Sequence, residues 1–257
     1  MHDLLWHQYG LIAIIFIWSG VVRSGLGFGG AVFSLPFLLM IVNDPLIWLP
    51  LISVHLLFFS ALTVIKNHKK SSNTDNPIAS TINWQYLRYA LAVIIIPKII
   101  GVFGLITLAP ELLSGIIFMI IAVYSTTYIF NKAFSSKNKY LDIIFLMLGG
   151  YISGTSLIGA PLIIAVLANH IDRHQLRDSL FVLWFVLVSI KMAAFIYVGI
   201  DLQLIHHLWL LPAAGIGHII GLRIHDSMLT ADPKNFYRGL GLILFALSVF
   251  GLWRNFY

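Results

Sequence analysis

The sequence predicts an all-α integral membrane protein with two inverted-topology repeats, each a re-entrant helical hairpin (or pair of short helices) plus three transmembrane helices. The 257 residues are 59% hydrophobic and only 10% charged, whereas ordinary globular domains are about 25% charged. Apolar runs recur at about 20 residues, the length that spans a hydrocarbon core. Cysteine is absent, which excludes disulfides and thiolate metal sites.

The elements fall into two halves, predicted as a first membrane repeat over residues 1–135 and a second, inverted repeat over 136–257. Each half opens with an apolar stretch that a glycine-rich segment interrupts, at about 10–42 and 141–168. Three uninterrupted apolar spans follow each stretch, namely 46–65, 84–107 and 111–130 in the first half and 179–199, 206–224 and 236–253 in the second.

Residue patterns recur between the halves, as expected for a repeat. Two glycines and a proline of the first broken stretch reappear 125 residues later: Gly25, Gly29 and Pro36 against Gly150, Gly154 and Pro161. The segment 98–101 likewise resembles the segment 218–221. These matches support the division into two equivalent halves.

The distribution of Lys and Arg predicts the topology, because these residues prefer cytoplasmic loops. Twelve of the 16 fall in four segments: 66–88, 131–140, 170–178 and 222–238. If these four segments lie on the cytoplasmic side, each broken stretch begins and ends on the same side of the membrane. The arms of the first stretch, residues 10–23 and 30–43, each measure about fourteen residues, or ~21 Å of helix, which is too short for a full span. We therefore expect hairpins and, with three spans in each half, an inverted second repeat.

Three cationic residues fall within apolar elements: Arg23, Lys98 and Lys191. No Asp or Glu accompanies them in these segments. A charge in the bilayer is costly unless it is paired or hydrated, so an anionic ligand is the expected partner. The alternative for Lys98 and Lys191 is that their long stems carry the ammonium groups to the headgroups. His218, which matches Lys98 in the second half, is a further candidate or a packing residue.

The hairpin tips supply the second feature of an anion site, a glycine-rich segment ahead of a helix whose free N–H groups point inward. Hydroxyl side chains of the second tip add further donors. The alternative is that small residues only allow membrane helices to pack closely. The predicted substrate-binding residues at the tips are Gly25, Gly27, Gly29, Gly30, Ser153, Gly154, Thr155 and Ser156.

Several other classes of site are excluded. Residues 25–30 fit G-x-G-x-x-G, but a dinucleotide site requires a soluble βαβ unit. His170 and His174 have the spacing of a metal pair, but no third or fourth ligand is apparent, so we interpret them as residues of a solvated loop. No ATP-binding loop occurs. We therefore predict no catalytic residue, metal, cofactor or nucleic-acid partner, and we attribute the net charge of +6 to contact with anionic lipid.

The segment 25–36, repeated more loosely as 150–161, resembles the signature of the TauE/SafE family, also called the toluene sulfonate uptake permease family. This resemblance implies a multi-pass transporter of the bacterial-type inner membrane that exports sulfite, sulfoacetate or a related organosulfur anion by alternating access. The short arms, the matched glycines and the three unpaired cations independently predict an anion at the midplane between the hairpin tips, near the starts of helical arms at Gly30 and Thr155. The alternatives are an anion channel, an importer coupled to protons or cations, and an integral membrane enzyme or assembly subunit.

Overall fold

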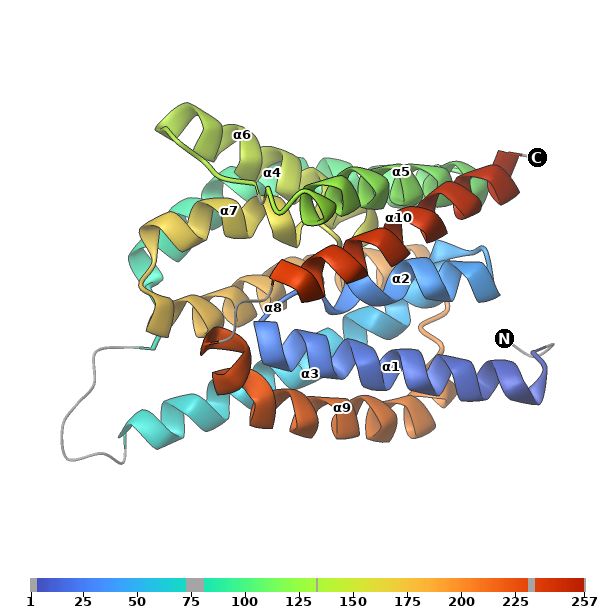
Figure 1. Ribbon diagram of the computed structural model, residues 1–257, viewed down its shortest axis with the longest axis horizontal. Helices are drawn as coiled ribbons and strands as arrows, with labels where there is room; N and C mark the ends of the chain where they lie inside the picture. Colours follow the sequence, from blue (N-terminus) through green and yellow to red (C-terminus); the bar gives the residue numbers. More distant parts are fainter. Residues whose placement is uncertain (1–3, 73–80, 133, 231–233, 257) are drawn as a thin grey trace. The chain divides into compact units, whose positions relative to one another are not determined.

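The computed structural model describes residues 4–72, 81–132, 134–230 and 234–256. These residues form α-helices and their connections, with no strand in the described ranges (Figure 1). The helices are α1 (Trp6–Leu26), α2 (Gly30–Ile41), α3 (Pro45–Ser72), α4 (Trp84–Thr107), α5 (Pro110–Ile129), α6 (Lys139–Ser156), α7 (Ala160–His170), α8 (Arg173–Val198), α9 (Leu204–Thr230) and α10 (Lys234–Phe256).

Seven of the described helices are long and apolar enough to cross a membrane. They are α1, α3, α4, α5, α8, α9 and α10, so six of them match the six predicted spans. α2 and α7 are shorter apolar helices. The chain is therefore a multi-pass, all-α membrane protein, as the composition predicts.

The described residues form two compact units that do not follow the two sequence halves. Unit 1 contains residues 1–51, 107–134 and 200–257, and unit 2 contains 52–106 and 135–199. Each unit thus combines one hairpin with helices from the other half of the chain. The division into repeats at residue 135 stays a prediction about sequence equivalence, and it does not describe these packing units.

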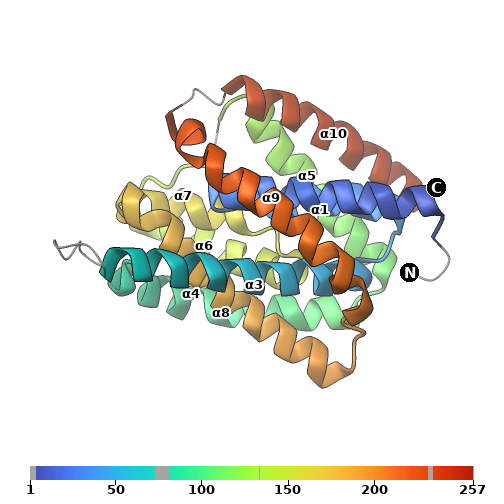
Figure 2. The same ribbon diagram turned by 90° about the horizontal axis from the view of Figure 1, so that it is seen from below.

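In unit 1, the first hairpin helix α1 lies along α9, and α5 lies along α10 (Figures 1 and 2). Glycines of α9 make the contact with α1 close. A Cβ added at Gly217 would collide with the carbonyl oxygen of Ile17, and one at Gly221 would lie 2.5 Å from that of Val21. Small residues that bring backbones together are the usual means of packing helices in lipid.

Unit 2 contains the second hairpin, in which α6 and α7 pack against each other. Its two ends meet, because His170 Nε2 lies 2.9 Å from Asp142 Oδ2. The amide of Asn169 also donates to the carbonyl oxygen of Ser136, which precedes α6. The second broken stretch therefore begins and ends at one end of its unit, as a hairpin should.

The arms of the first hairpin differ from the two arms of about fourteen residues that were expected at 10–23 and 30–43. α1 has 21 residues and α6 has 18, whereas α2 has 12 and α7 has 11. Each hairpin therefore joins a long helix to a short one. The expectation was wrong for α1 because Arg23 does not end the helix. Its side chain is buried within the last turn, and the helix continues to Leu26.

The two helix breaks are not separated by the 125 residues that relate the matched glycines and prolines. α1 ends at Leu26 before Gly27 (φ 80°), and α6 ends at Ser156 before Leu157 (φ 62°), so the breaks lie 130 residues apart. Both caps adopt the left-handed conformation that commonly ends a helix. The sequence comparison gave an offset of 125 residues because it matched glycines and prolines by residue type. It did not compare the positions at which the helices end.

Candidate functional site

Lys98 lies inside unit 2, and its ammonium group stays there. The residue is 0% exposed, and its Nζ donates to the carbonyl oxygen of Ser153 at 2.8 Å and to the hydroxyl of Ser153 at 3.1 Å. Lys98 thus joins the middle of α4 to the end of α6. An ammonium group held in this way does not extend to the headgroups, so the snorkelling alternative is wrong for Lys98.

Lys191, on α8 of the same unit, is also 0% exposed. Its Nζ has no hydrogen-bond partner among the described residues. It lies close enough to Lys98 for the two like charges to interact unfavourably. The ion pairs within the described ranges join His170 to Asp142 and Arg177 to Asp178, so neither of these lysines belongs to one.

The three hydroxyl groups at the end of α6 differ in what they can offer a ligand. Thr155 and Ser156 both donate to the carbonyl oxygen of Ile152, at 3.0 and 2.9 Å. Ser153 accepts from Lys98, so its own hydrogen is not used by that bond. Thr155 was expected near the start of a helical arm, but it lies in the last turn of α6, and α7 begins at Ala160.

Unit 1 contains a second buried polar cluster at the end of α1. Arg23 is 5% exposed and lies next to Ser24, whose Oγ is 2.6 Å from Nδ1 of His218 on α9. The first tip follows directly: Gly25 lies in α1, Gly27 caps it, Gly29 (φ 84°) caps α2, and Gly30 begins α2.

Gly154 was expected to let a ligand approach the backbone at the second tip, but it packs against α4. A Cβ at Gly154 would lie 2.5 Å from the carbonyl oxygen of Lys98 and 2.7 Å from the Cα of Gly101. Gly154 therefore brings α6 against α4, which is the packing alternative. A valine at position 154 would separate α4 from α6, so its effect would report on helix packing and not on ligand binding.

The polar contacts of the two units correspond. Gly101 on α4 faces Gly154 and Thr155, while Gly221 on α9 faces Ser24 and Gly25. In these contacts, a residue of α1 corresponds to the residue of α6 that lies 130 positions later in the sequence. A residue of α4 corresponds to the residue of α9 that lies 120 positions later. Lys98 and His218 then occupy matching positions, in agreement with the sequence comparison.

Sequence patterns did not identify a third set of polar residues, at the other end of α6. His170 was interpreted as a solvated loop residue, but it binds Asp142 and stacks on Tyr86 of α4, with ring centroids 4.6 Å apart. No local pattern connects residues so distant in sequence. Within the described ranges, no three His, Cys, Asp or Glu side chains gather as metal ligands.

Long apolar helices and two helical hairpins define a multi-pass membrane protein, in which Lys98 and Lys191 are buried without an acidic partner among the described residues. The chain belongs to the sulfite exporter TauE/SafE family, whose sequence profile matches residues 11–251. This family consists of membrane transporters of sulfite or related anions, and its members are not enzymes. Comparison with curated proteins and with solved structures gave no significant match.

Proposed function

We propose that the protein is a secondary transporter that exports sulfite or an organosulfur anion across the inner membrane of a bacterial-type cell. The observation that carries this proposal is the ammonium group of Lys191, fully buried and without a hydrogen-bond partner among the described residues. A buried charge costs several kcal/mol unless it is balanced. An oxyanion balances Lys191 and Lys98 together, because each of its oxygen atoms accepts hydrogen bonds.

In the proposed site, the anion contacts Nζ of Lys191 and the remaining N–H of Lys98. Two of the three Lys98 donors already bond to Ser153, which fixes the direction of the third. The Ser153 hydroxyl supplies a further donor. This arrangement favours a compact oxyanion over a halide, since several donors converge from α4, α6 and α8.

Export agrees with the energetics of an inside-negative membrane. A monoanion that leaves such a cell gains ~2.3 kcal/mol per 100 mV, whereas import requires a coupled cation or proton to offset this term. An exporter therefore works without a coupled ion. We accordingly propose export as the direction, with the Lys- and Arg-rich loops in the cytoplasm.

The test is uptake of radiolabelled sulfite into proteoliposomes that contain the full chain, with sulfoacetate, thiosulfate and sulfate as competitors. We expect Lys98→Met and Lys191→Met each to reduce transport more than about tenfold, which corresponds to about 1.4 kcal/mol. Lys66→Met is the matched control, because Lys66 is an exposed lysine of the same unit. Wild-type transport by Lys191→Met would overturn the site.

A counterflow experiment separates a transporter from a channel. Unlabelled sulfite inside the vesicles should accelerate uptake of the labelled anion, because an alternating-access protein returns faster when it is loaded. A channel shows no such acceleration. An inside-positive potential should increase uptake if a net negative charge crosses alone, and a dependence on a proton gradient would instead indicate coupled import.

A further inference from the structure

Unit 2 has an open cleft of about 750 Å³ at the end where Asp142 and His170 meet. The start of α4, the start of α6, the end of α7 and the segment before α6 line it. Its walls include Tyr86 and the exposed lysines Lys137 and Lys139. This volume is far larger than a small oxyanion requires, so the cleft admits a hydrated ion.

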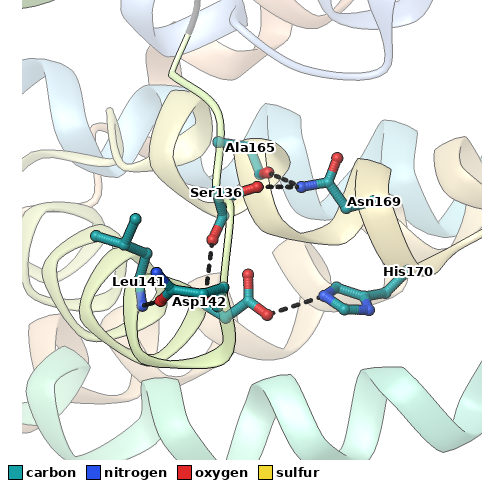
Figure 3. Close-up of polar contacts among 7 residues, drawn as sticks. Ser136, Leu141, Asp142, Ala165, Asn169 and His170 are labelled. Carbon is teal, nitrogen blue, oxygen red and sulfur yellow. Dashed lines mark hydrogen bonds and ion pairs between the residues drawn. The ribbon is translucent and has the colours of Figure 1, made fainter.

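The walls of the cleft are fixed by hydrogen bonds between elements (Figure 3). The amide of Asn169 donates to the carbonyl oxygen of Ser136 at 3.0 Å and to that of Ala165 at 3.2 Å. Asn138 caps α6 by accepting from the N–H of Leu141 at 2.9 Å. The segment that carries Lys137 is therefore held against α7 on one side and against α6 on the other.

The charge of the lining is positive. Asp142 is the one carboxylate among the residues that line the cleft, and Figure 3 shows it directed at His170, with Oδ2 2.9 Å from Nε2. The negative charge of Asp142 therefore interacts with His170. Lys137 and Lys139 have no recorded ion pair within the described ranges, so their charges are available to a ligand.

The cleft is separate from the lysine pair in the interior. Asp142 and Ser153 both lie on α6, and eleven residues of helix correspond to about 16 Å. Ser153 binds Lys98, whereas Asp142 binds His170. An anion in the cleft therefore does not contact the Lys98 ammonium group.

We propose that this cleft is a second anion-binding site, a vestibule in which Lys137 and Lys139 bind the transported oxyanion weakly before it reaches Lys98 and Lys191. The identity of the anion rests on the proposed function, but the cleft and its charge do not. Cationic groups around a low-dielectric cleft raise the local concentration of an anion and its rate of association. The site is thus expected to act on the apparent affinity and not on the maximal rate.

The first experiment compares Lys137→Gln/Lys139→Gln with the control Lys66→Gln/Lys132→Gln. The control removes two exposed lysines that do not line the cleft. Sulfite transport in proteoliposomes should show an increase of about tenfold in KM for the cleft variant, with kcat within about twofold and a weaker dependence of kcat/KM on salt. An unchanged KM, or an equal change in the control, would refute the vestibule.

The second experiment does not depend on transport. Equilibrium binding of radiolabelled sulfite is measured on the Lys98→Met/Lys191→Met protein in phosphatidylcholine nanodiscs. The vestibule predicts residual, salt-sensitive binding that the further change Lys137→Gln/Lys139→Gln removes. Complete loss of binding in the first variant overturns the vestibule, even if sulfite proves to be transported.

A lipid headgroup offers the same phosphate-like chemistry as a free oxyanion, so the binding assay is repeated with phosphatidylglycerol in the nanodiscs. A vestibule for the soluble substrate should retain its sulfite binding, apart from a modest loss due to the negative surface. If phosphatidylglycerol abolishes binding and the cleft lysines do not affect KM, the cleft holds a lipid headgroup and the substrate proposal is overturned.

Discussion

The ammonium group of Lys98 on α4 lies 2.8 Å from the carbonyl oxygen of Ser153 on α6. The matching helices of unit 1 are also joined by a buried polar contact, between His218 on α9 and Ser24 on α1 at 2.6 Å. Both contacts connect a hairpin from one half of the sequence with a helix from the other half. In each unit, a buried polar contact thus joins helices from the two halves of the sequence.

Replacement of Lys191 by methionine should stabilise the protein while it removes transport. The ammonium group is 0% exposed and without a hydrogen-bond partner in the described part of the chain, so a neutral side chain of similar length removes an unfavourable charge. A gain of 1 kcal/mol raises the melting temperature by about 2–4 °C in a chain of this size. We expect a rise of about 3 °C or more in detergent without substrate.

Differential scanning fluorimetry of both proteins, with and without sulfite, provides the check. Sulfite should raise the melting temperature of the wild type more than that of Lys191→Met, because a ligand stabilises the folded state according to how tightly that state binds it. A lower melting temperature of the variant would show that Lys191 is a structural residue.

Replacement of Arg23 by glutamine should weaken anion binding. A charged hydrogen bond contributes about 1.5–3 kcal/mol, which corresponds to roughly ten- to a hundredfold in affinity. Arg88→Gln is a suitable control, because Arg88 is an exposed arginine on α4. Arg254 is unsuitable, since it donates a 2.7 Å hydrogen bond to the carbonyl oxygen of Met40.

Binding of radiolabelled sulfite to the purified variants measures this effect. Both variants should first elute as a single monodisperse species, so that a loss of affinity reports on binding. An equal affinity for Arg23→Gln and Arg88→Gln would contradict a contribution of Arg23 to anion binding.

Two glycines of α4 should respond in opposite ways to alanine. A Cβ at Gly101 would collide with the carbonyl oxygen of Tyr151 on α6, whereas one at Gly104 would meet no atom within 4 Å. Gly101→Ala should therefore destabilise by about 1–3 kcal/mol, the usual cost of overpacking. Gly104→Ala should be neutral or stabilise by up to about 1 kcal/mol, because alanine favours a helix over glycine.

Thermal unfolding in detergent distinguishes the two substitutions on the same helix. The close contact of α4 with α6 predicts a lower melting temperature for Gly101→Ala alone. Equal melting temperatures for the two variants would contradict this packing.

The Lys and Arg distribution predicts that residues 131–140 are cytoplasmic and that the connection near Asp201 is external. Because the chain has no cysteine, single cysteines report their position without background. We expect an impermeant maleimide to label Asp201→Cys in intact cells whose outer membrane is permeabilised, and to label Lys132→Cys only after lysis. The reverse pattern would invert the topology. Residue 73, in another predicted cytoplasmic loop, lies outside the described residues.

The sequence alone predicted much of the secondary structure and the class of protein. Long apolar runs can only be helices in lipid, since every backbone polar group must be bonded within its own segment. The six uninterrupted spans therefore all appear as helices, and α4 has the predicted bounds Trp84–Thr107. α3, α8 and α9 extend six or seven residues beyond the predicted apolar run at one end. The sequence also located Arg23, Lys98 and Lys191 within apolar segments, and the structure buries all three. It left open whether the two lysines extend to the headgroups.

The tertiary structure decided which of these residues meet. Whether Lys98 reached the headgroups or Ser153 depended on the register of α4 against α6, which close contacts such as that of Gly101 with Gly154 determine. It also placed Asp142 beside His170, 28 residues away in sequence. A one-dimensional pattern records the period of a helix but not the face that another helix covers, so long-range polar contacts and the cleft could only emerge from packing.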